Sequence, residues 1–181
     1  MKKLSKNLLV SLTLALSFQS MAFAENDRHN LSNNPIGSML GLSSLEYSYK
    51  IFDHMTIGLT GASGRIKISN TQIAGDSYGV ISRIYFQPAF VNDSWYIVAA
   101  ATKMKHYEVS ITKNAIKYTG KLKETDISGG VGYHWFWSSF NANLGALMTN
   151  QPNLELRDVS GNKYKNYDKT VSAEFNIGWK F

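Results

Sequence analysis

The last segment of the chain, from Val171 to Phe181, alternates strictly between apolar residues and polar or small ones. Its apolar positions are Val171, Ala173, Phe175, Ile177, Trp179 and Phe181. Successive side chains of a β-strand point to opposite faces, so a period of two predicts a strand with one apolar and one polar face. We therefore expect the chain to end in a half-buried strand that finishes on an aromatic residue.

The same alternation recurs along most of the chain. It predicts further strands at residues 44–51, 55–60, 78–87, 95–104, 125–137 and 140–148. The alternation is poor near residues 28–36, but we expect an eighth strand there. If the strands form a barrel in a membrane, the sheet must close, because an open edge in lipid leaves backbone groups unpaired. The alternative is that residues 25–35 form a plug or a segment outside the wall.

Short and long connections alternate between these strands. Short ones lie near 52–54, 88–94 and 138–139, and long polar ones near 62–76, 105–124 and 150–168. Short turns at one end and longer loops at the other are typical of β-barrels that span a membrane. The predicted fold class is therefore all-β, an eight-stranded antiparallel up-and-down transmembrane barrel.

The N-terminus has the three parts of a secretory signal peptide. A basic start, Met1 to Lys6, precedes an apolar run from Leu8 to Phe18 and an Ala22-Phe23-Ala24 cleavage site. The apolar run is too short for a membrane-spanning helix, which needs about 20 residues. We expect residues 1–24 to be removed and residues 25–181 to form a single barrel domain.

Composition narrows the chemistry. Loss of Lys2, Lys3 and Lys6 with the signal lowers the formal charge from +6 to +3, so the remaining domain is only mildly basic. The chain has no Cys, which excludes disulfides and zinc–thiolate sites. The four His residues are scattered, and no acidic cluster accompanies them. We therefore expect no metal and no cofactor, and no recognised nucleic-acid motif is present.

Several segments resemble small bacterial outer-membrane β-barrels. Residues 44–61 resemble a strand–turn–strand unit of these proteins, and Gly130-Val-Gly-Tyr-His134 resembles their Gly-x-Gly-Tyr runs. The layout as a whole resembles the OmpX/Ail group, whereas Asn34-Pro-Ile-Gly37 and Gly41 look closer to related outer-membrane barrel families of uncharacterised function.

This resemblance implies a location and a class of role. The expected location is the outer membrane of a Gram-negative bacterium, reached by Sec export, with Phe181 read as an assembly signal by the barrel-assembly machinery. The expected protein is a monomer with a non-enzymatic role in envelope structure or in adhesion- or defence-like surface interaction. External hairpins near 62–76, 105–124 and 150–168 would carry that role.

Charged residues on the polar faces of the strands predict a network inside the barrel. The residues expected there are Glu46, Lys50, Arg83, His134 and Glu174. An eight-stranded barrel is narrow and is filled by side chains, and charges buried in it must be paired and hydrogen-bonded. The functional alternative is a lumen that conducts protons, ions or small solutes.

A lysine-rich segment predicts an external basic patch. Its members are Lys103, Lys105, Lys113, Lys117, Lys121 and Lys123. Lys binds phosphate as a point charge, so the expected partners are outer-membrane lipid and the phosphates of lipopolysaccharide. A host or environmental polyanion is the alternative partner, and an ordinary solvated hairpin needs no partner at all.

An enzyme that modifies lipid A is the runner-up function, as either an acyltransferase or a hydrolase. Such a site needs a nucleophile, a base and an orienting group within reach of one another. Asp76-Ser77 and His106, at the starts of external segments, are the candidate residues. These residue types are common, so we favour a non-enzymatic protein.

Overall fold

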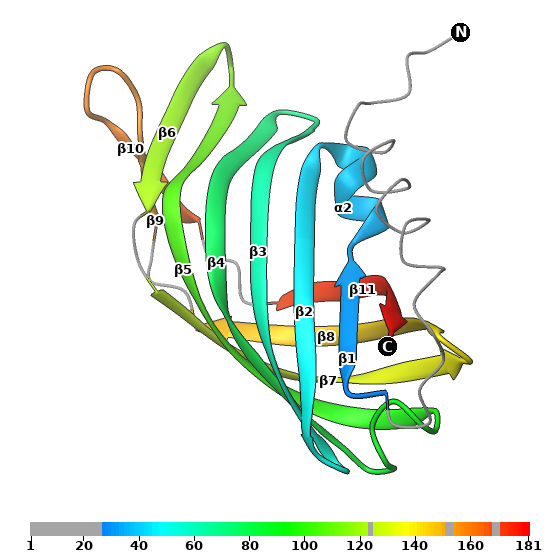
Figure 1. Cartoon of the computed structure of the whole chain (residues 1–181). Helices are drawn as coiled ribbons and strands as arrows, with labels where there is room; N and C mark the ends of the chain where they lie inside the picture. Colours follow the sequence, from blue (N-terminus) through cyan, green and yellow to red (C-terminus); the bar gives the residue numbers. More distant parts are fainter. Residues whose placement is uncertain (1–26, 123–124, 151–153, 168–170) are drawn as a thin grey trace, which may run out of the picture.

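The computed structural model describes residues 27–122, 125–150, 154–167 and 171–181 (Figure 1). The predicted signal peptide, residues 1–24, lies outside these ranges. The strands that form the barrel wall are β1 His29–Asn33, β2 Leu42–Phe52, β3 Met55–Ile68, β4 Thr71–Tyr85, β5 Ser94–Lys113, β7 Thr125–Trp137, β8 Phe140–Asn150 and β11 Val171–Lys180. Within the described residues, no helix combines the length and apolarity needed to cross a membrane.

These strands form a closed eight-stranded antiparallel barrel, as predicted. The order around the wall is β5-β4-β3-β2-β1-β11-β8-β7, and pairing of β7 with β5 closes the circle. Each strand pairs with its neighbour along the wall, and the last strand returns to the first. We call the end with the connections 53–54, 86–93 and 138–139 the turn end, and the opposite end the hairpin end.

Barrel closure differs in detail from the prediction. The first strand was expected near 28–36, but β1 stops at Asn33, and α2 follows it from Pro35 to Leu40. The Asn34 side chain accepts a hydrogen bond from the Gly37 N–H at 2.7 Å, and Pro35 starts the helix with a φ that suits the first turn. Gly41, with φ of 101°, ends it. Residues 25–35 therefore do not act as a plug where the structure describes them.

The short β1 still joins the two ends of the chain. Asn30 lies opposite Lys180 and Asn33 opposite Ile177, so β1 pairs with the turn-end part of β11. At the rim, Phe181 donates its N–H to the carbonyl of His29 at 2.9 Å, and its ring stacks on the His29 imidazole.

The hairpins expected near 62–76 and 105–124 are present as paired strands over their described residues. Residues 62–76 belong to β3 and β4, which meet at a turn at Ser69 and Asn70, and residues 105–122 belong to β5 and β6 (Ile116–Leu122), which meet at Asn114 and Ala115. The sequence marked them as polar connections between shorter strands. The pairing runs through almost their whole length and satisfies the backbone beyond the wall.

A small apolar cluster supports this extension. Val109 of β5 and Leu156 of β9 (Leu154–Arg157) are fully buried, and Tyr118 of β6 packs against them. β9 pairs with β10 (Lys163–Tyr167), and residues 158–162 connect the two strands. In this connection, hydrogen bonding by the Asn162 side chain holds the pKa of the Asp158 carboxyl below its usual value. The three strands extend the wall as a sheet beyond the hairpin end (Figure 1).

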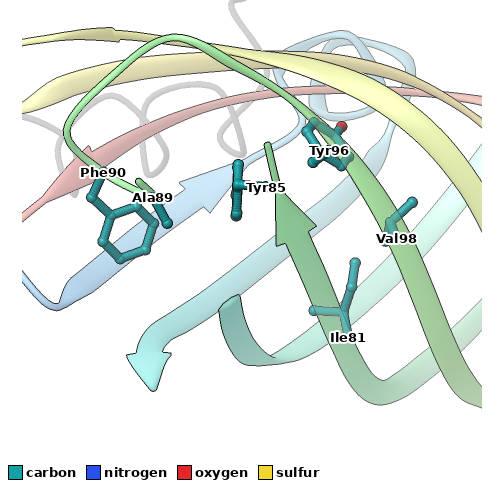
Figure 2. Close-up of a cluster of buried hydrophobic side chains, with 6 residues drawn as sticks. All are labelled: Ile81, Tyr85, Ala89, Phe90, Tyr96 and Val98. Carbon is teal, nitrogen blue, oxygen red and sulfur yellow. The ribbon is translucent and has the colours of Figure 1, made fainter. Parts of the chain in front are cut away.

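The connection between β4 and β5 folds into the lumen instead of lying on the rim. Figure 2 shows Ala89 and Phe90 of this turn beside Tyr85 and Tyr96 of the adjoining strands. The Lys180 ammonium donates to the Phe90 carbonyl at 2.5 Å, and the Ala89 N–H donates to the Asp53 carbonyl at 2.6 Å. These contacts hold the turn against the inside of the barrel wall.

The outer surface carries an apolar belt. Its exposed members include Leu45, Tyr47, Ile57, Leu59, Val80, Ile84, Ile97, Ile127, Val131, Leu144, Met148 and Val171. Exposed aromatic residues at the turn-end rim of this belt are Phe52, Phe86, Trp95 and Trp137. Contiguous apolar surface of this extent is unusual on a protein that faces water.

Glycine at position 132 makes room for the Tyr96 ring, and this can be tested. A Cβ on Gly132 would overlap the Tyr96 ring and its hydroxyl, and would lie 2.7 Å from the Leu144 carbonyl oxygen. We expect Gly132→Ala to lower the free energy of unfolding by about 1–3 kcal/mol through overpacking. On the same strand, a Cβ on Gly129 meets nothing nearer than the Val98 carbonyl at 3.7 Å, so Gly129→Ala should unfold like the wild type. Urea titration of the refolded barrel measures both, and equal midpoints would contradict the prediction.

Candidate functional site

The centre of the lumen holds a buried cluster of three charges. Arg83 of β4 forms ion pairs with Glu46 of β2 and Glu174 of β11. The three residues are 2%, 7% and 9% exposed. Arg83 Nη2 also reaches the second Glu46 oxygen at 2.9 Å, so one guanidinium holds two carboxylates from different sides of the barrel.

Neutral side chains complete the environment of the carboxylates. Ser48 donates to Glu46 at 2.7 Å, and Tyr96 and the Asn176 amide donate to Glu174 at 3.3 and 2.9 Å. These hydrogen bonds offset the cost of burying charge. The cluster therefore ties β2, β4, β5 and β11 together across the lumen.

A second network of side-chain hydrogen bonds lies nearer the turn end. His134 contacts the Tyr85 hydroxyl through Nδ1 at 3.1 Å and the Asn141 amide oxygen through Nε2 at 2.9 Å. Asn141 in turn donates to Asn30 of β1 at 2.8 Å. His134 thus lies in the lumen, adjacent to the charged cluster but not bonded to it. Lys50 is half-buried on β2 and makes no ion pair among the described residues.

The carboxylates of the central cluster in the lumen are held by Arg83. Over the described ranges, no group of three or more His, Asp or Glu residues is placed to hold a metal ion. Each carboxylate of the cluster is already bonded to Arg83.

Two of the residues suggested for an enzyme, Asp76 and Ser77, do not face each other. Asp76 and Ser77 are neighbours on β4, so their side chains point to opposite faces of the wall. Asp76 is exposed beside Lys105 and accepts a hydrogen bond from Ser63 at 2.6 Å, whereas Ser77 is half-buried opposite Met104. The backbone of His106 belongs to β5, and its side chain lies outside the description.

Four of the predicted basic residues share the outward face of the wall. Lys103 and Lys105 lie on this face of β5, and Lys117 and Lys121 on this face of β6. Lys113 ends β5 at the tip of its hairpin, and Lys123 lies outside the described residues. The patch is therefore the outward side of a sheet.

Sequence reasoning missed two cations on the same face. Arg65 and Lys67 of β3 are exposed and lie opposite Ala74 and Gln72 of β4, which in turn lie opposite Glu108 and Ser110 of β5. The alternation Arg65-Ile-Lys-Ile68 would have identified them if residues 62–76 had been taken as strand.

Comparison with known proteins identifies the fold. The sequence matches no protein-family model and no curated protein sequence. Among solved structures, the barrel is similar to the N-terminal β-barrel domain of Pseudomonas aeruginosa OprF, with 14% identity and a TM-score of 0.54 over 86% of this chain and 98% of that domain. The two share one barrel fold.

A second solved structure with a related shape is Outer Membrane Protein W of E. coli. It has 15% identity and a TM-score of 0.47, over 87% of this chain and 99% of that protein. The resemblance to the OmpX/Ail group is not confirmed by either match and stays a prediction.

Proposed function

We propose that this protein is an integral barrel of the Gram-negative outer membrane with a closed lumen, and that its role in the envelope is structural and non-enzymatic. The observation that carries this proposal is the pairing of an exposed apolar belt with an interior that is polar and densely filled. A soluble β-barrel has the reverse arrangement, whereas a lipid-embedded one needs an apolar exterior and a fully paired backbone.

The belt also supports an orientation. Its aromatic rim, with Phe52, Phe86 and Trp137, lies at the turn end, and rings of this kind favour the membrane–water interface. Short turns of outer-membrane barrels face the periplasm, so the β5–β6 and β9–β10 hairpins would stand outside the cell. Phe181 would then sit at the periplasmic rim, where the barrel-assembly machinery could read it.

A closed lumen argues against the channel alternative. The side chains of Arg83, Tyr96, Phe90 and His134 are among the largest that are fully buried, and all lie within the barrel. Two barriers lie in series, the ion-paired cluster at the centre and the Phe90 turn at the turn end. The functional surface is then the external sheet of hairpins, which suits a surface-interaction role of the kind implied by the OmpX/Ail resemblance.

Location and conductance test this proposal together. We expect the protein to fractionate with outer membranes, to run faster on electrophoresis before heating than after, and to give no stepwise current in planar bilayers. Recovery in the soluble periplasmic fraction would contradict the membrane assignment. Steady conductance from the wild type would favour the channel. A lipid A acyl pattern that changes in a Ser77→Ala strain would favour the enzyme.

A further inference from the structure

We propose that the outward cations beyond the apolar belt form a binding site for the phosphate groups of lipid A at the outer surface of the membrane. This inference rests on the proposed function, because it needs the hairpin end to face the outer leaflet. The members of the site, which we call the outward cation rows, are Arg65, Lys67, Lys103, Lys105, Lys117 and Lys121.

The register of the strands places these residues in successive rows. Residues paired in an antiparallel sheet lie side by side on one face, and outward positions along a strand repeat about every 7 Å. Leu59, Val80 and Ile127 make the last purely apolar row with Ala101. The next row holds Tyr78 and Lys103. The outer surface therefore changes from apolar to cationic between one row and the next.

The two rows above hold further cations, each row together with one carboxylate. Asp76 and Lys105 lie side by side in one row. The row beyond it runs from Arg65 on β3 to Lys121 on β6. A bulge in β5 between Lys105 and Glu108 lets Glu108 and Lys121 keep the outward face despite the shift in register. The cations therefore form a two-dimensional patch over three strands.

No carboxylate of the described residues is ion-paired with any of the six cations. Across the part of the chain that the structure describes, none of the outward cation rows forms an ion pair, even where Glu108 lies directly opposite Lys121. Like charges gathered on one face repel one another, and this cost is relieved when an external anion lies among them. The patch therefore fits a partner that carries several negative charges at close spacing.

An adjoining apolar surface indicates that this partner is an amphiphile. α2 ends beside the rows, because the Arg65 N–H donates to the Gly41 carbonyl at 3.0 Å. Three of the six residues of α2 expose apolar side chains: Ile36, Met39 and Leu40 are 53%, 71% and 49% exposed. A soluble polyanion would gain nothing from this helix or from the belt below. A lipid with phosphates on its head group contacts apolar and cationic surfaces together.

Binding in detergent tests the site directly. The folded barrel in neutral detergent is titrated with lipid A carried in the same detergent, and binding is followed by thermophoresis of the labelled protein. A Lys or Arg near an anionic lipid surface contributes roughly fivefold in affinity. We therefore expect the triple variant Arg65→Gln, Lys103→Gln, Lys105→Gln to bind lipid A at least about tenfold more weakly. Binding to the wild type should also weaken as salt is raised.

The control variant removes the same charge elsewhere. Arg28→Gln, Lys113→Gln, Lys163→Gln changes cations at the turn-end rim and at the hairpin tips, and it should bind lipid A like the wild type. Dephosphorylated lipid A should bind the wild type as weakly as the triple variant binds intact lipid A. Phosphatidylglycerol, with one phosphate for each molecule, should bind more weakly than lipid A.

Two results would overturn the site: equal affinity of the wild type and the Arg65/Lys103/Lys105 variant, or equal affinity for intact and dephosphorylated lipid A. The second comparison uses only the wild type and does not depend on the variant folding. If lipid A binding is absent while the protein fractionates with outer membranes, the site is wrong and the proposed function stands. If the protein is not in the outer membrane, the proposed function itself is wrong.

Discussion

Replacement of Arg83 by Met is expected to lower the free energy of unfolding of the barrel by about 3–5 kcal/mol. The reason is electrostatic, because the substitution keeps an apolar chain of similar length in place. It leaves Glu46 and Glu174 facing each other inside the lumen without their shared cation. Buried carboxylates without a partner are far more costly than the loss of a single hydrogen bond.

Urea unfolding followed by tryptophan fluorescence measures this effect. The matched control is the neutral triple variant Glu46→Gln, Arg83→Met, Glu174→Gln, which removes every charge of the cluster at once. Replacing a whole buried ion-pair cluster is often nearly neutral, so this variant should recover most of the lost stability. If the triple variant is as unstable as Arg83→Met alone, the cost comes from lost packing, and the charge argument is wrong.

This cluster shows what the alternation of residues can predict. Glu46, Arg83 and Glu174 all fall on polar positions of predicted strands, and in a closed barrel every inward position faces one shared space. The pattern therefore places them in the same lumen without any knowledge of register. It does not say which side chains meet. That depends on strand register and on Gly132 and Gly145, which leave room for Tyr96 to reach Glu174.

The parts that were not predicted share a physical cause. Residues 62–76 and 105–122 were expected as polar hairpins, and the pairing confirms them. The predicted strands 55–60, 78–87 and 95–104 ended too early, however, because a strand beyond the apolar belt keeps its period while its outward face becomes charged. α2 depends on the Asn34 cap and on Gly41, a local signal that alternation does not report. Arg65 and Lys67 were missed because the predicted strand at 55–60 stopped before them, whereas β3 continues to Ile68.

The short connection predicted near 88–94 is present between β4 and β5, but alternation did not predict that it folds inward. Phe90 is 1% exposed inside the barrel, whereas Phe86 of the same connection is 62% exposed on the outside. The burial of the Phe90 ring therefore fixes this connection to the inside of the barrel.

Replacement of Phe90 by Ala is accordingly expected to lower the free energy of unfolding by about 3 kcal/mol. The ring packs edge-on against Phe136 and fills the space below Tyr85 and Tyr96, and its removal leaves a cavity there. Phe86→Ala is the control, since its ring faces the detergent or lipid, and its unfolding midpoint should change little.

The backbone at Phe90 allows packing and strain to be separated. Its φ of 68° lies in the left-handed region, which costs about 1–2 kcal/mol for a residue with a Cβ. Phe90→Gly removes the ring and this strain together, so it should be more stable than Phe90→Ala by about 1 kcal/mol. Both variants should remain non-conducting in planar bilayers, because the Arg83 cluster still closes the centre of the lumen. Stepwise current from Phe90→Ala alone would show that the turn is the sole barrier and that the central cluster leaves a path for ions.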